Sequence, residues 1–126
     1  MKKAILACLL ATSAMSAFAE WTKIFTTGSG IFVYIDFQTI RKNGDLRKVW
    51  AIFDKVPLEK DGTISWREQI EINCKEEIVR ILYLTNHTGP MASGKMTSFV
   101  GAGLSDPEAI PPGSSSETIL KIVCAK

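Results

Sequence analysis

The clearest pattern in the chain is the alternation of apolar and polar residues from Ile64 to Cys74. The even positions carry isoleucine, tryptophan and cysteine, and polar residues stand between them, which is the period of a β-strand with one buried face. Glu68 is the single polar residue in the apolar row. The stretch therefore predicts the central strand of a sheet.

Other stretches with apolar, β-branched or aromatic residues predict further strands of an antiparallel sheet. They are residues 21–27, 31–37, 46–54, 78–85 and 95–100. Residues 36–41 predict a short turn, residues 86–94 a loop and residues 101–113 an irregular connection. A helix over residues 71–84 is the competing assignment, because glutamate and lysine favour helices. The β-branched residues in that stretch favour strands instead.

Tight turns separate these strands where glycine occurs. Gly28-Ser29-Gly30 follows the first strand, and Asn43-Gly44 precedes the third, where a tight reversal needs positive φ. Asp61-Gly62 leads into the central strand.

The end of the chain has the pattern of a helix. Ser114 is followed three residues later by Glu117, which is a capping box, and Ile119, Leu120 and Val123 form an apolar stripe before Cys124. The expected fold class is α+β: an antiparallel β-sheet of about six strands with a C-terminal helix packed on it.

The beginning of the chain has the pattern of a secretory signal peptide. Lys2 and Lys3 precede an apolar run, and Ala17-Phe18-Ala19 is a small-x-small cleavage site. We therefore expect residues 1–19 to be removed between Ala19 and Glu20, leaving residues 20–126 as a single domain. The apolar run is too short and too interrupted for a membrane span, which needs about 20 apolar residues. Cleavage before Cys8, as in a lipoprotein, is a weaker alternative because almost no apolar region would precede it.

Export changes how the charge is interpreted. Removing Lys2 and Lys3 from the 15 basic residues leaves 13, equal to the 13 acidic residues, so the formal charge of +2 disappears. A formally neutral domain without long basic runs gives no indication of nucleic-acid binding.

Two cysteines, Cys74 and Cys124, remain after Cys8 leaves with the signal peptide. An even number of cysteines in an exported protein favours a disulfide between them. Two buried free thiols are the alternative. A bond across this separation would stabilise the fold by about 4 kcal/mol in the chain-entropy treatment.

The sequence offers little for catalysis. His87 is the only histidine, in an expected polar loop, and a Ser-His-Asp triad would need it to meet Asp54 or Asp106 and an unidentified serine. His87 also has no neighbours at zinc-ligand spacing. The segment TGSG at 27–30 lacks the glycine spacing of a nucleotide-binding loop. We expect a protein that is not an enzyme and has no metal or cofactor.

Several short motifs in a fixed order resemble the surface-adhesin protein E family. They are Trp21, YIDFQTI at 34–40, KVW at 48–50, EINC at 71–74, IPPGS at 110–114 and VC at 123–124. The resemblance implies a C-terminal helix tethered to the sheet by a disulfide, which here matches Cys74 and Cys124. The chain departs from the family where Asp106, Pro107 and Glu108 replace the usual tryptophan before IPPGS.

The resemblance also implies a function. It implies a non-catalytic binding protein of a Gram-negative bacterium, at the outer-membrane surface or in the periplasm, with host matrix or plasma proteins such as laminin, vitronectin and plasminogen as partners. An exposed edge strand makes a homodimer a further option.

Two alternatives of other classes stay open. One is a periplasmic protein with an envelope role or an inhibitor of a hydrolase such as lysozyme. In the inhibitor, residues 27–30 or 86–94 would form a loop that plugs the active site of the target enzyme. The neutral charge does not favour a basic target. The other is a small hydrolase that depends on His87.

Overall fold

The computed structural model describes residues 20–55, 62, 64–101 and 105–125. It contains an antiparallel sheet of eight strands in the order β1-β2-β4-β5-β6-β7, in which β3 pairs with β4 and β8 pairs with β6. The expected signal peptide and its cleavage site after Ala19 lie outside the described residues, apart from Glu20. The strands are β1 (Trp21–Thr26), β2 (Phe32–Asp36), β3 (Arg41–Asn43), β4 (Leu46–Asp54), β5 (Ser65–Asn73), β6 (Ile78–His87), β7 (Met96–Val100) and β8 (Glu108–Ala109).

The predicted fold class is confirmed, and the main strands lie where the alternation placed them. β4 has the predicted bounds, and β5 has its even-numbered positions from Glu68 to Ile72 buried. The alternative helix over residues 71–84 is wrong, since β5 and β6 form a hairpin there. Two short strands, β3 and β8, were not predicted, because three and two residues are too few to show a period.

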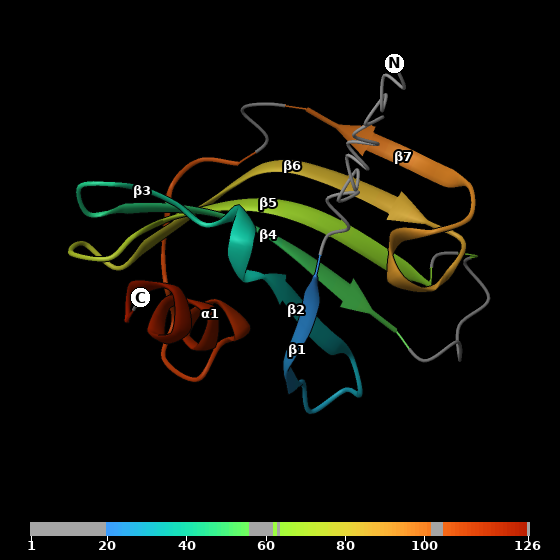
Figure 1. Ribbon diagram of the computed structural model, residues 1–126, viewed down its shortest axis with the longest axis horizontal. Helices are drawn as coiled ribbons and strands as arrows, with labels where there is room; N and C mark the ends of the chain where they lie inside the picture. Colours follow the sequence, from blue (N-terminus) through green and yellow to red (C-terminus); the bar gives the residue numbers. More distant parts are fainter. Residues whose placement is uncertain (1–19, 56–61, 63, 102–104, 126) are drawn as a thin grey trace, which may run out of the picture.

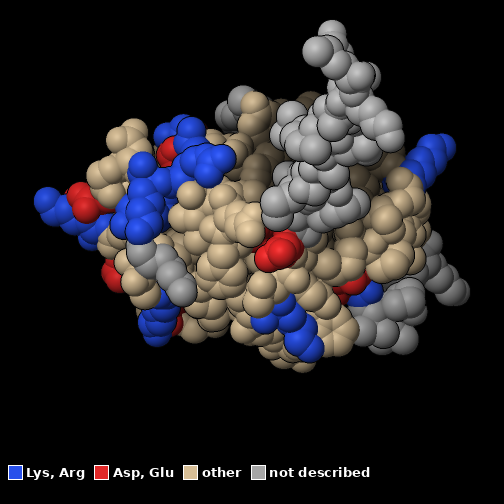
Figure 2. All heavy atoms as spheres, in the orientation of Figure 1, with Lys and Arg blue, Asp and Glu red and all other residues tan. Residues whose placement is uncertain are grey.

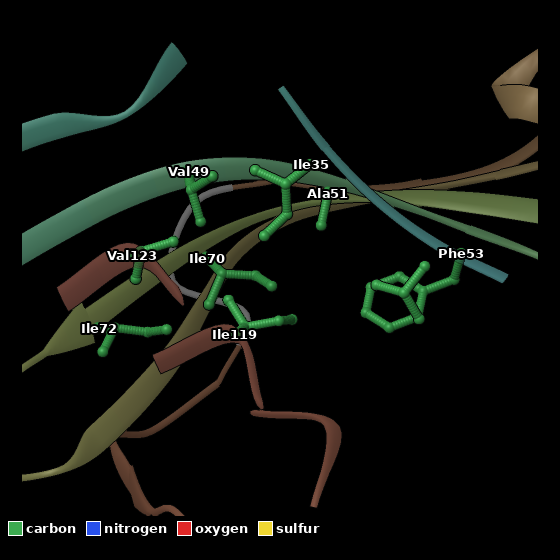
Figure 3. Packing of buried hydrophobic residues seen from close by; sticks show 9 residues of the cluster. Ile35, Val49, Ala51, Phe53, Ile70, Ile72, Ile119 and Val123 are labelled. Atoms are coloured by element: carbon green, nitrogen blue, oxygen red, sulfur yellow. The ribbon is translucent and has the colours of Figure 1, made fainter. Parts of the chain in front are cut away.

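The core lies between one face of the sheet and the C-terminal α-helix, α1 (Ser115–Cys124). Figure 1 shows α1 beside the sheet, and Figure 3 shows isoleucine and valine side chains of both elements meeting. Ile119 and Val123 of α1 are buried against Val49, Ile70 and Ile72 of β4 and β5. Burial of these side chains contributes roughly 1.5–3 kcal/mol each.

Both ends of α1 are fixed as the sequence indicated. The Ser114 hydroxyl accepts a hydrogen bond from the backbone N–H of Glu117. At the other end Cys74, just after β5, forms a disulfide with Cys124, with 5.8 Å between their Cα atoms. The free-thiol alternative is therefore wrong, and the helix is tied to the sheet covalently.

Among the described residues, two 3-10 turns lie between strands. The first, η1 (Phe37–Thr39), lies where a short turn was expected. The second, η2 (Pro90–Ala92), lies in the connection between β6 and β7. β1 and β7 form the two edges of the sheet.

Candidate binding face

The sheet has a second face, opposite α1, which we call the open face. Because side chains alternate along a strand and paired residues share a face, its members follow from the register. Val49, Ala51 and Phe53 belong to the core, so Trp50 and Ile52 of β4 lie on the open face. Ile52 pairs with Arg67, which therefore shares that face.

An aromatic strip crosses the open face over three strands. It consists of Trp50 on β4, Tyr83 on β6 and Phe99 on β7. Trp50 and Tyr83 both pair with Gln69, and their ring centroids are 6.3 Å apart in a stacked arrangement. Phe99 lies 6.3 Å from Tyr83 and is 61% exposed, and Trp50 and Tyr83 are half-buried.

A cation lies over this strip. The Arg67 guanidinium carbon is 5.3 Å from the centroid of the Trp50 ring, which is cation–π geometry. Arginine and large aromatics are the residue types enriched where proteins bind other proteins. The strip therefore has the composition of a macromolecular contact surface.

The connection between β6 and β7 covers one end of the same face. Ser65 on β5 donates its hydroxyl hydrogen to the Gly89 carbonyl at 2.7 Å and accepts a hydrogen bond from the Ala92 N–H at 2.9 Å. η2 packs against both β4 and β5. Residues 88–92, part of the segment 86–94 that the inhibitor alternative would use to enter an active site, are folded back onto the sheet.

His87 is not in a polar loop, as the sequence predicted, but ends β6 and is only 7% exposed. The strand continues two residues beyond the expected end because Thr85 and His87 keep the alternation of burial. The His87 Nε2 atom lies 2.8 Å from the Thr85 hydroxyl, and Nδ1 is buried without a partner. Desolvation and, secondarily, the charge of Arg67 lower the pKa of His87, which favours the neutral form of the ring.

The register places Asp54, Ser65 and His87 side by side across β4, β5 and β6. This arrangement does not form a catalytic triad. Serine stands in the middle, whereas the histidine must lie between the other two groups to relay a proton. Moreover, Ser65 is fully buried and already engaged with η2. Asp106, the other carboxylate considered, is exposed in the connection that precedes β8.

Glu68 is the polar residue that the sequence placed in the apolar row of β5, and the structure shows what surrounds its carboxyl group. It lies on the helix side of β5, is 8% exposed and accepts a hydrogen bond from the Trp66 indole N–H at 3.0 Å. Burial raises the pKa of Glu68 to about 7, against the opposing effect of that hydrogen bond. The carboxyl lines a cavity of about 190 Å³ beneath the first turn of α1.

Two classes of site are not found among the described residues. No group of three or more histidine, cysteine or acidic side chains is arranged to hold a metal ion in this part of the chain. No helix within the same ranges is long and apolar enough to cross a membrane.

An antiparallel sheet with one covering helix, a disulfide clip and an open aromatic face defines a small binding domain. The family model of surface-adhesin protein E matches residues 21–125. The chain belongs to the surface-adhesin protein E family, as the order of its short motifs indicated.

Solved structures with the same fold include those of Haemophilus influenzae protein E. Its crystal form II has 13% sequence identity and a TM-score of 0.60, over 86% of this chain and 89% of that chain. The selenomethionine form has 14% identity and a TM-score of 0.59, over 86% and 88% respectively. Protein E from non-typeable Haemophilus influenzae has 13% identity and a TM-score of 0.56, over 88% and 79%. No curated protein matches the sequence.

Proposed function

We propose that this chain is an exported, surface-displayed adhesin that binds a host extracellular-matrix or plasma protein through its open face. The observation that supports this most strongly is the aromatic strip of Trp50, Tyr83 and Phe99 with Arg67 stacked on it. Membership of the surface-adhesin protein E family supports a host extracellular-matrix or plasma protein as the partner.

The strip is suited to a macromolecule for two reasons. It lies on a continuous sheet face, so an incoming protein surface can contact several rings at once. Its central residues are carried by β4 and β6, which pair with β5 along their lengths, so little side-chain or backbone ordering is needed on binding. A rigid aromatic surface is therefore available before the ligand arrives.

Export is part of the same proposal. Residues 1–19 act as a signal peptide, cleavage follows Ala19, and the mature domain begins at Glu20. The Cys74–Cys124 disulfide supports this, because such bonds persist in oxidising compartments outside the cytoplasm. We place the mature domain on the outer-membrane surface of a Gram-negative bacterium rather than free in the periplasm.

A homodimer is compatible with this arrangement. β7 is an edge strand whose five residues are all exposed and carry no charge. An uncharged edge can pair with a second copy. Sedimentation of the mature protein across a range of concentrations tests this, and a constant monomer mass would remove the dimer from the proposal.

The binding proposal is tested with mature protein on surfaces coated with laminin, vitronectin or plasminogen. Phe99→Ala removes the most exposed ring of the strip, and we expect at least a tenfold loss of affinity for the protein that binds. Val100→Ala is the matched control, because it trims the next residue of β7 on the other face of the strand. Absence of binding to all three proteins, or equal affinity of both variants and the parent, would contradict the proposal.

A further inference from the structure

The hairpin formed by β3 and β4 carries an unusual concentration of positive charge. Residues 41–48, which we call the basic arm, contain Arg41, Lys42, Arg47 and Lys48 against one acidic residue, Asp45. Figure 1 shows the arm at the left of the view, extending beyond α1, and Figure 2 shows lysine and arginine side chains gathered over that region. The mature chain is formally neutral, so this concentration is local.

The strand register brings like charges together. Arg41 pairs with Lys48, and Lys42 pairs with Arg47. Because neighbouring pairs alternate between faces, one cationic pair lies on each face of the arm. Like charges directly opposite each other destabilise a hairpin, so this arrangement is unfavourable for folding alone.

The acidic residue that the register places beside the arm is Glu71 of β5, which pairs with Lys48 and also with Arg80 of β6, so this region keeps an excess of positive charge. Within residues 20–55, 62, 64–101 and 105–125, the ion pair that the structure contains is Lys121–Glu117, on α1. The Arg47 guanidinium donates to the Gly44 and Leu46 carbonyls at 2.7 and 3.0 Å. These carbonyl contacts hold the side chain in place but leave its charge uncompensated.

We propose that the basic arm binds a sulfated polysaccharide, such as a glycosaminoglycan chain. The arm pairs with β5 along one side, and cations on both of its faces suit a flexible linear polyanion that follows its free edge. Arginine also matches the geometry of sulfate oxygens with paired N–H donors. Leu46 is the one apolar residue of the arm and is half-buried, so the arm offers little of the apolar and aromatic surface found at the core of a protein interface. The arm is thus a site separate from the aromatic strip.

The test uses heparin as the probe and the mature protein with its disulfide intact. Calorimetric titrations compare Lys42→Gln/Lys48→Gln with Lys23→Gln/Lys95→Gln, which removes the same charge from two exposed lysines elsewhere. We expect the arm variant to bind heparin at least tenfold more weakly and the control to bind like the parent. Between about 50 and about 200 mM salt, the slope of log affinity against log salt should fall by about 1.5 in the arm variant.

The thermal midpoint shows whether the arm variant is folded. It should stay close to that of the parent, because each substitution relieves a like-charge pair while Lys48→Gln also removes the charge opposite Glu71. Equal losses in the two double variants, or none in the arm variant, would overturn the proposal. So would equally tight binding of desulfated heparin, or of a single-stranded DNA oligomer of matched charge. Heparin titration measures the arm alone, whereas the Phe99 series measures the open face with protein ligands, so either proposal can fail separately.

Discussion

Replacing Glu68 by glutamine should change how the stability of the fold depends on pH. Burial raises the pKa of Glu68 from its ordinary value of 4.5 to about 7. One unit of pKa corresponds to 1.36 kcal/mol, so a shift of this size is worth about 3 kcal/mol. The source of the shift is geometric: the carboxyl lies between the sheet and α1, beside Phe53, Ile70 and Ile119.

The direction follows from which state releases its proton first. Below about pH 4.5 Glu68 is neutral in both the folded and the unfolded chain, and its burial does not reduce the free energy of unfolding. As the pH rises towards 7, the unfolded chain ionises while the folded chain holds the proton, so the free energy of unfolding falls. Above the folded-state pKa of about 7 the carboxylate is ionised and buried, and the free energy of unfolding has fallen by the full amount that this group can remove.

Glu68→Gln keeps an oxygen acceptor for the Trp66 indole and removes the ionisation. We expect the variant to equal the parent at about pH 4 and to exceed it by up to about 3 kcal/mol at about pH 8. Urea unfolding followed by tryptophan fluorescence measures this. Glu76→Gln, in the exposed turn that follows β5, controls for the loss of one negative charge. Parallel pH profiles for Glu68→Gln and the parent would refute the reasoning.

Three further predictions concern the supports of the fold. Serine at both Cys74 and Cys124 should lower the free energy of unfolding by about 4 kcal/mol for a separation of 50 residues, and a melting temperature unaffected by reductant would contradict the tether. Ser114→Ala should lower it by about 1 kcal/mol by leaving the Glu117 N–H without its acceptor, and thermal unfolding compared with Ser114→Thr tests this. Gly44→Ala should also lower the free energy of unfolding by about 1 kcal/mol, because φ at this position is +59° and alanine adopts that conformation at a cost. A thermal midpoint equal to that of the parent would contradict this and mean that the turn relaxes.

The parts of the fold that were predictable are those in which one residue type determines the local structure. The even positions of β5, the Ser114 cap and the pairing of Cys74 with Cys124 each depend on local pattern or on simple counting. The Asn43-Gly44 reversal was placed correctly, but asparagine ends β3 and Gly44 with Asp45 forms the turn. Only Gly44 has positive φ there, so a single glycine was sufficient for the reversal.

The candidate site was not predictable because it depends on register between strands. Trp50 and Tyr83 are 33 positions apart, and they stack because both lie opposite Gln69. A β-bulge between Gln69 and Ile70 shifts the register between β5 and β6 and so places Tyr83 opposite Gln69. The local sequence pattern does not predict this bulge. His87 was predicted in a polar loop for a related reason. It is buried by β5 and η2, which are distant in the sequence or follow it, and not by its immediate neighbours in β6.

The most direct test of the central claim is protease accessibility of the mature domain on intact cells, compared with cells whose outer membrane has been opened. A surface-displayed adhesin should be digested on intact cells, with a periplasmic marker protein protected in the same sample. Protection of the domain until the outer membrane is opened would place it in the periplasm and contradict a role in binding host proteins.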